Sequence, residues 1–130
     1  MSLATDPDFF DLLVSSYRRT VGSEPAFLEH GQHPSAEWLY EQGGHCVLAH
    51  NTDPDPRFIY ANRAAQIAFE YDWDEITQLP SRLSAAGYSG VRIAKSGRRF
   101  WIEEGVVWQL VDRDGAVRGQ AATFARWRDP

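Results

Sequence analysis

The sequence is poor in cysteine and lysine, with one of each, Cys46 and Lys95, among 130 residues. A single cysteine excludes an intrachain disulfide, as is usual in reducing compartments, so we expect a cytoplasmic protein. Basic residues nowhere cluster beyond adjacent arginine pairs, and the formal net charge is −5. Because a nucleic-acid surface needs a basic stripe to neutralise phosphates, DNA and RNA binding are disfavoured.

Long apolar runs are also missing. No stretch approaches the roughly 20 residues that cross a bilayer, and the amino terminus lacks the basic and apolar regions of a signal peptide. We therefore expect no membrane association, and we interpret residues 1–5 as a tag or a disordered start. Hydrophobic residues nevertheless make up 43% of the chain, which is enough for the core of one folded domain.

Residues 6–20 have the pattern of an amphipathic helix. Asp6 is placed to cap its amino end, and Pro7 suits the first turn. Four apolar residues recur at helical spacing, namely Phe9, Phe10, Leu13 and Tyr17. Such a stripe must be buried, either against the chain's own sheet or against a second subunit. Both alternatives stay open, and these four residues with Trp101 form the candidate homodimer interface.

This helix and a linker occupy residues 6–34, and the main domain occupies residues 35–130. The predicted helices lie at 35–42, at 63–70 and from 72 onward, and the predicted strands lie at 45–50, 57–61, 91–94, 98–111 and 116–127. Tight turns join the last three strands, so they form an antiparallel meander. The helices between the second and third strands must therefore cross one face of the sheet.

The strand predicted over residues 98–111 has one apolar face. Its even positions are apolar, namely Phe100, Ile102, Val106, Trp108 and Leu110. Because successive side chains of a strand alternate between its two faces, these residues are expected on the core side. Residues 103–105, Glu-Glu-Gly, are a candidate bulge that would shift this alternation.

Two runs resemble the PAS signature: residues 58–65, FIYANRAA, and residues 69–76, FEYDWDEI. In that family an asparagine closes the second strand, and an aromatic residue followed by acidic residues opens a later helix. A closer resemblance is to the MEKHLA domain, a PAS-related family, at residues 79–84, 88–93, 96–100 and 118–124. That family occurs as stand-alone bacterial proteins and as the carboxyl-terminal domain of some plant homeodomain–zipper regulators. Because the present sequence contains no homeodomain or zipper, it resembles the stand-alone bacterial members.

The resemblance implies an α+β, PAS-like fold: a five-stranded antiparallel sheet with short helices over one face, preceded here by the amino-terminal helix. It also implies a pocket between the sheet and those helices. Family members carry a further helical stretch after the equivalent of Ser84, which in PAS domains forms one wall of the pocket. Here only residues 85–87 precede Tyr88. Either this wall is short, or the sequence lacks residues of a loop.

Motifs for catalysis and for metal binding are missing. No serine lies in a G-x-S-x-G turn, and Glu103 and Glu104 are neighbours, so a regular strand points them to opposite faces. One cysteine cannot supply the paired ligands of a structural zinc site. Flavin photochemistry in light-sensing PAS domains needs an Asn-Cys motif that the chain does not have. We therefore expect no enzyme, no metal and no cofactor.

The candidate ligand pocket lies between the helices and the even-numbered face of the long strand. Its predicted residues are Asn62, Phe69, Phe100, Ile102, Val106, Trp108, Gln120, Ala122 and Phe124. Small Ala122 would leave room for a ligand, and Gln120 and Asn62 would orient it. The alternative is a packed core in which Asn62 caps a helix and Gln120 bonds to the backbone.

The function predicted from these features is a sensory or regulatory module that binds an unidentified small molecule, forms a homodimer and acts through a separate effector protein. A protein-interaction module with a filled core is the first alternative. A small α+β enzyme is the second.

Overall fold

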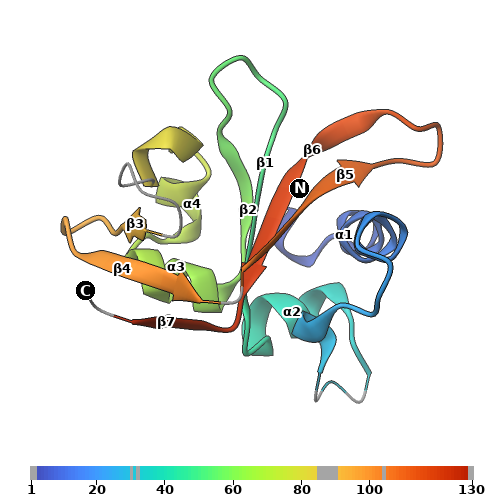
Figure 1. The fold of residues 1–130 in the computed structure, drawn as a ribbon, viewed down its shortest axis with the longest axis horizontal. Coiled ribbons are helices and arrows are strands. Elements are labelled where there is room, and N and C mark those ends of the chain that lie inside the picture. The colour runs from blue at the N-terminus through green and yellow to red at the C-terminus, as the bar shows by residue number, and fades with distance from the viewer. Residues whose placement is uncertain (1–2, 30, 32, 85–90, 104, 129–130) are drawn as a thin grey trace.

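The computed structural model describes residues 3–29, 31, 33–84, 91–103 and 105–128 (Figure 1). An antiparallel sheet forms the centre, with helices on both of its faces. The helices are α1 (Pro7–Thr20), α2 (Ala36–Gln42), α3 (Arg63–Phe69) and α4 (Trp73–Ile76), with 3-10 turns η1 (Leu3–Thr5), η2 (Ala26–Leu28) and η3 (Ser81–Ser84). The strands are β1 (Cys46–His50), β2 (Phe58–Ala61), β3 (Val91–Ile93), β4 (Arg99–Glu103), β5 (Val106–Val111), β6 (Val117–Phe124) and β7 (Arg126–Arg128). No helix in these ranges is both long and apolar enough to span a bilayer.

The strands confirm the predicted PAS-like α+β fold, with one refinement. All pairings are antiparallel, in the orders β2-β1-β6-β5 and β3-β4-β7. The strand predicted over 98–111 is interrupted between β4 and β5, and the last strand is interrupted between β6 and β7. These two long strands form a ribbon that passes from one sheet to the other. The five predicted strands are thus present, but their hydrogen bonds are divided between two sheets.

The interruption at Gly105 changes which side chains face the helices. A side-chain carbon added to Gly105 would lie 3.1 Å from the Cγ2 atom of Ile102, so the chain bends tightly where it has no side chain. Phe100 and Ile102, before the bend, pack with α3 on what we call the inner face. Trp108, after it, packs under α1 on the opposite, outer face. The bend therefore reverses the alternation, as a bulge does.

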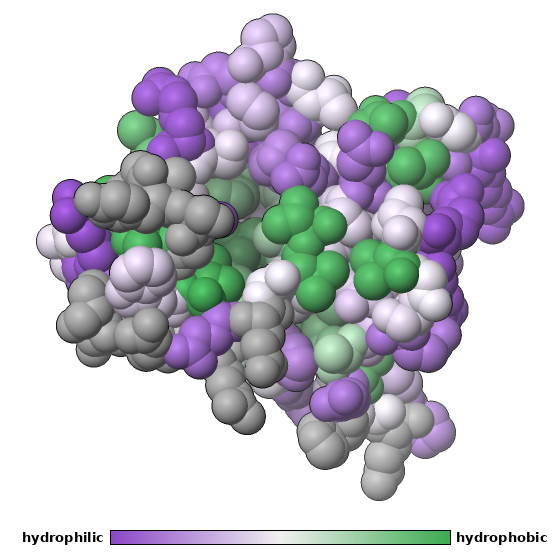
Figure 2. Space-filling model, in the orientation of Figure 1, coloured by the Kyte–Doolittle hydropathy of each residue, from purple (hydrophilic) through white to green (hydrophobic). Residues whose placement is uncertain are grey.

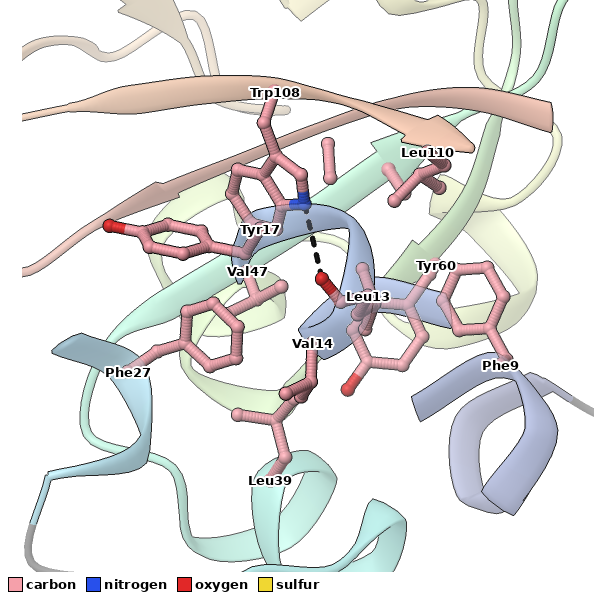
Figure 3. Close-up of a cluster of buried hydrophobic side chains, with 12 residues drawn as sticks. Phe9, Leu13, Val14, Tyr17, Phe27, Leu39, Val47, Tyr60, Trp108 and Leu110 are labelled. Atoms are coloured by element: carbon pink, nitrogen blue, oxygen red, sulfur yellow. Dashed lines mark hydrogen bonds between the residues drawn. The ribbon is translucent and has the colours of Figure 1, made fainter. Parts of the chain in front are cut away.

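The apolar stripe of α1 covers the outer face of the chain's own sheet (Figure 3). The ring of Trp108 lies 4.9 Å from that of Tyr17, edge to face, and stacks on Phe27 at 5.8 Å. The indole nitrogen of Trp108 donates a hydrogen bond to the carbonyl of Leu13 at 3.2 Å. Such aromatic contacts add to the free energy gained by burying the rings, so α1 and the sheet form one core.

Polar contacts join α1 to the end of the edge strand β5. The hydroxyl of Ser16, which is fully buried, accepts a hydrogen bond from the amide of Val111 at 2.9 Å and donates one to its carbonyl at 3.2 Å. Arg19 donates to the same carbonyl. These bonds satisfy backbone groups that an edge strand otherwise leaves open.

The amino-terminal segment contributes to the core: residues 3–5 belong to the stretch that the sequence analysis interprets as a tag or a disordered start, and in the structure they form a helical turn. Leu3–Thr5 form η1, and Ala4 is buried. Asp6 caps α1 by accepting a hydrogen bond from the amide of Asp8 at 3.0 Å, as predicted. Because α1 shares the outer-face core with β1 and β5, the predicted 6–34 and 35–130 segments pack as one unit.

Candidate functional site

The inner face is closed at one end by three phenylalanines. The rings of Phe69 and Phe100 lie 5.1 Å apart, and those of Phe69 and Phe124 lie 6.3 Å apart, both nearly edge to face. All three side chains are buried in the core beneath α3. Three of the predicted pocket residues therefore meet on the predicted face, and they fill it at this end.

Asn62 also lies at this end, and its side chain is fully bonded within the protein. Its Oδ1 atom accepts from the amides of Val47 at 3.0 Å and Ala65 at 3.1 Å. Its Nδ2 atom donates to the carbonyls of His45 at 2.8 Å and Leu39 at 3.3 Å. An asparagine side chain has two donors and two acceptor positions, so none is left for a ligand. This confirms the alternative in which Asn62 caps α3.

The inner face then continues onto β5 and β6, where it is open. In the strand register, Ala122 lies opposite Val107 on one side and Leu48 of the inner-face core on the other. Residues directly opposite in antiparallel strands share a face. We call this region the open strip; it comprises His50, Val107, Gln109, Gln120 and Ala122.

The open strip combines an apolar centre with one polar end. Val107 is 57% exposed, Ala122 is partly exposed, and both glutamines are exposed. Figure 2 shows hydrophobic surface gathered near the centre of the molecule, where β4 passes into β5, with a recess beside it. The strip therefore offers an apolar floor with hydrogen-bonding groups at one end, the composition typical of small-molecule sites.

Two predicted pocket residues lie elsewhere. Val106 and Trp108 belong to the outer-face cluster under α1, because the bend at Gly105 reverses the alternation. Sequence reasoning put them in the pocket and missed Val107, Gln109 and His50. The Glu-Glu-Gly run at residues 103–105 was the signal available, since a bulge there predicts the reversal. The short pocket wall expected at residues 85–87 falls outside the described ranges.

The candidate dimer residues do not form one surface. Phe9, Leu13 and Tyr17 are buried in the chain's own core, so a partner cannot contact them in this conformation. Trp101 lies on β4, on the far side of the molecule from α1 in Figure 1. Of the five predicted residues, Phe9 and Phe10 line a hollow beside α1, and Phe10 is the one of these two that is partly exposed.

This hollow, of about 1190 Å³, follows the solvent side of α1 and reaches the β5–β6 hairpin. Acidic residues line it along the amino-terminal half of the helix, at Asp8 and Asp11. Arginines line it along the carboxyl-terminal half, at Arg18 and Arg19. The helix thus presents opposite charges at its two ends.

A group of charged contacts holds the β3–β4 turn against α3 and α4; we call it the turn latch. Glu70 accepts hydrogen bonds from the amide and the hydroxyl of Ser96, and Arg98 lies 3.5 Å from it. Lys95 pairs with Glu75. The Ser96 hydrogen bonds and, to a smaller extent, Arg98 lower the pKa of Glu70, and the Lys95 bond lowers that of Glu75. The latch fixes the border of the inner face.

Cys46 is a buried core residue on β1, as predicted. Burial raises the pKa of its thiol to about 12, so the thiol stays protonated at neutral pH and is a poor nucleophile. Among the described residues, no three histidine, cysteine, aspartate or glutamate side chains are grouped so as to hold a metal ion.

Comparison with known families covers nearly the whole chain. A model described as the MEKHLA domain matches residues 7–87 and 84–129. The two matched segments meet at residues 84–87, where the resemblance predicts a shortened stretch. A search of curated proteins found no significant match.

Solved structures show the same fold at low identity. An RNA-binding light-oxygen-voltage receptor is 18% identical with a TM-score of 0.58, over 85% of this chain and 35% of the receptor. A variant of the photoreceptor Vivid is 12% identical with a TM-score of 0.57, over 87% and 99% of the two chains. The light-state dimer of this fungal photoreceptor gives 13% identity and 0.52, over 85% and 91%. At these identities, the likeness shows a PAS-like fold alone.

Proposed function

This chain belongs to the MEKHLA domain family, and we propose that it is a sensory or regulatory module that binds a small molecule on its inner face. The observation that carries the proposal is the exposure of Val107 on the face that α3 and α4 bury elsewhere. Exposed apolar surface is unfavourable in water and is covered when a ligand binds, and an apolar patch bordered by polar groups is typical of a binding site. The proposal includes no catalytic step.

The open strip favours a ligand with an apolar body. Val107 and Ala122 would contact that body, and the amides of Gln109 and Gln120 would donate or accept hydrogen bonds at one end. The three phenylalanines under α3 already fill one end of the inner face, so we place the ligand on the open strip at the other end. Output would pass through a separate effector protein.

We also propose a homodimer, formed through the solvent side of α1. Two copies of α1 packed antiparallel about a twofold axis would place Asp8 and Asp11 of one copy near Arg18 and Arg19 of the other. This replaces the interface predicted from Leu13 and its stripe, which are buried in the monomer.

Substitution of Val107 tests the ligand proposal. We expect Val107→Asp to abolish thermal shifts that members of a metabolite panel produce in the wild type, because a carboxylate in the apolar centre would have to be desolvated on binding. Val117→Asp is the matched control, since Val117 is also an exposed strand valine, 47% accessible, but lies at the hairpin end of β6.

Native mass spectrometry distinguishes a ligand-binding module from a protein-interaction module. A ligand retained by the wild type supports binding, whereas no adduct and no thermal shift with any compound favours the alternative, a protein-interaction module. The filled cluster of Phe69, Phe100 and Phe124 is the observation that favours this alternative.

A further inference from the structure

Arg92, on β3, is placed on the inner face. It lies directly opposite Phe100 in the β3–β4 register, and Phe100 is at the centre of the inner-face core. The side chain of Arg92 is half-buried, and burial lowers the pKa of its guanidinium without removing the charge at neutral pH. Its hydrogen bond within the described ranges is to the carbonyl of its own neighbour, Val91, at 3.0 Å.

Four other arginines of this chain form ion pairs with carboxylates. Arg18 pairs with Glu24, Arg82 with Asp55, Arg98 with Glu70 and Arg118 with Asp112. Among the residues that the structure describes, no carboxylate lies within ion-pair distance of Arg92. A guanidinium that is partly removed from water and lacks a counter-charge is costly. Its planar donors would gain most from a carboxylate or a similar anion.

An apolar track leads from Arg92 to the open strip. Phe100 stands beside Arg92, Ile102 follows it on the same face, and Ile102 abuts Gly105 at the bend. Val107 comes two residues later and belongs to the open strip. Val107 lies seven positions after Phe100, a path of at most about 23 Å in extended chain, and the bend shortens it. Because Arg92 lies directly opposite Phe100, an elongated molecule can contact both Arg92 and Val107.

We infer that the ligand of the inner face is an apolar carboxylate whose anionic group is bound by Arg92 and whose body lies along Ile102 toward Val107. The inference rests on the proposed function, because it names the chemical class of the same ligand. It adds Arg92 as the residue that selects for charge.

The test compares two compounds that share one apolar body. Decanoate and 1-decanol would each displace the neutral fluorescent reporter N-phenyl-1-naphthylamine from the 130-residue chain. We expect Arg92→Gln to weaken decanoate roughly 10- to 100-fold, the usual effect of losing a hydrogen bond to a charged group. The affinity for 1-decanol should change by less than about twofold, since the alcohol carries no charge for Arg92 to bind.

Two further variants serve as controls. Arg99→Gln makes the same change on the adjacent strand at an exposed residue opposite Ile93, on the other face, and should leave both affinities unchanged. Arg92→Lys should recover part of the decanoate affinity, because the ammonium keeps the charge but not the planar pair of donors. In the wild type, high salt should weaken decanoate and not 1-decanol, a measurement that needs no variant.

The possible results distinguish a failure of the inference about Arg92 from a failure of the proposed function. If the reporter and both compounds fail to bind the wild type while a compound of the metabolite panel does bind, the inference is overturned; if no compound of the panel binds either, the proposed function is wrong. If they bind, but Arg92→Gln weakens both compounds equally or neither, and salt has no selective effect, the inference about charge is overturned while the ligand site stands.

Discussion

At the scale of single residues, Asn62 connects three parts of the inner-face end. Its side chain caps α3 through Ala65, holds the start of β1 through Val47 and His45, and reaches the carbonyl of Leu39 on α2. Each of these partners is a backbone group. The contribution of Asn62 therefore depends on its own side-chain amide and not on the side chains of its partners.

Removal of this side chain should therefore be costly. We expect Asn62→Ala to lower the free energy of unfolding by about 3 kcal/mol, because it leaves buried donors and acceptors unsatisfied and removes a helix cap. Urea unfolding measures it. Gln120→Ala, at an exposed position, should change it by less than about 0.5 kcal/mol. An unchanged urea midpoint for Asn62→Ala would show that the four bonds do not contribute.

At the scale of elements, the turn latch connects the β3–β4 turn to α3 and α4. The backbone takes part as well: the amide of Lys95 donates to the carbonyl of Phe69 at 2.9 Å, and Arg98 donates to that of Ala68 at 2.8 Å. Glu70 itself has a positive φ of 65°, the left-handed conformation common at helix ends. The latch thus sets the position of β3, and with it the position of Arg92.

The latch predicts a response to acid. The pKa values of Glu70 and Glu75 lie below their ordinary 4.5 in the folded protein. Their stabilising effect is therefore complete above that value and is lost as the pH falls through the lowered pKa values. We expect Glu70→Gln to lower the melting temperature at neutral pH. On acidification, the melting temperature of the variant should fall by less than that of the wild type.

Calorimetry over a series of pH values would measure this difference. Glu41→Gln, an exposed change on α2, is the control and should follow the wild-type pH profile. Parallel profiles for Glu70→Gln and the wild type would mean that the latch does not stabilise the fold.

At the scale of the whole molecule, the two faces of the sheet are covered to different extents. The outer face is sealed by α1, whose aromatic contacts and Ser16 bonds join it to β5. The inner face is sealed at one end only. We therefore place the ligand on the inner face and the second subunit beyond α1, so that α1 and the sheet separate the two.

The dimer proposal is tested on the solvent side of α1. Ser15 is exposed in the second half of this helix and lines the hollow. We expect Ser15→Arg to give a monomer by light scattering, because a bulky cation would stand where the two helices cross. Ile67→Arg, on α3 across the sheet and 67% exposed in the monomer, should leave the dimer intact. A monomeric wild type, or a Ser15→Arg dimer of unchanged strength, would contradict the proposal.

Sequence by itself determined the elements and the family of this protein. Asp6, Asn62 and the Asp72–Glu75 capping box start helices where predicted, because a cap is formed by residues a few positions apart. The strands follow in the same way from alternation, and the antiparallel pairing of the last three predicted strands follows from the tight turns that join them. Such short-range signals do not depend on the rest of the fold.

Only the tertiary structure decided on which face of the sheet each side chain lies. One bend at Gly105 moves Trp108 to the outer face and Val107 to the inner face, since alternation has a period of two and a shift by one residue reverses it. The partner of the α1 stripe was likewise open in the sequence, because an apolar helix face is satisfied equally by its own sheet or by another chain. The folded chain resolves this in favour of its own sheet, and because α1 covers the outer face there, we propose the inner face as the place for a ligand.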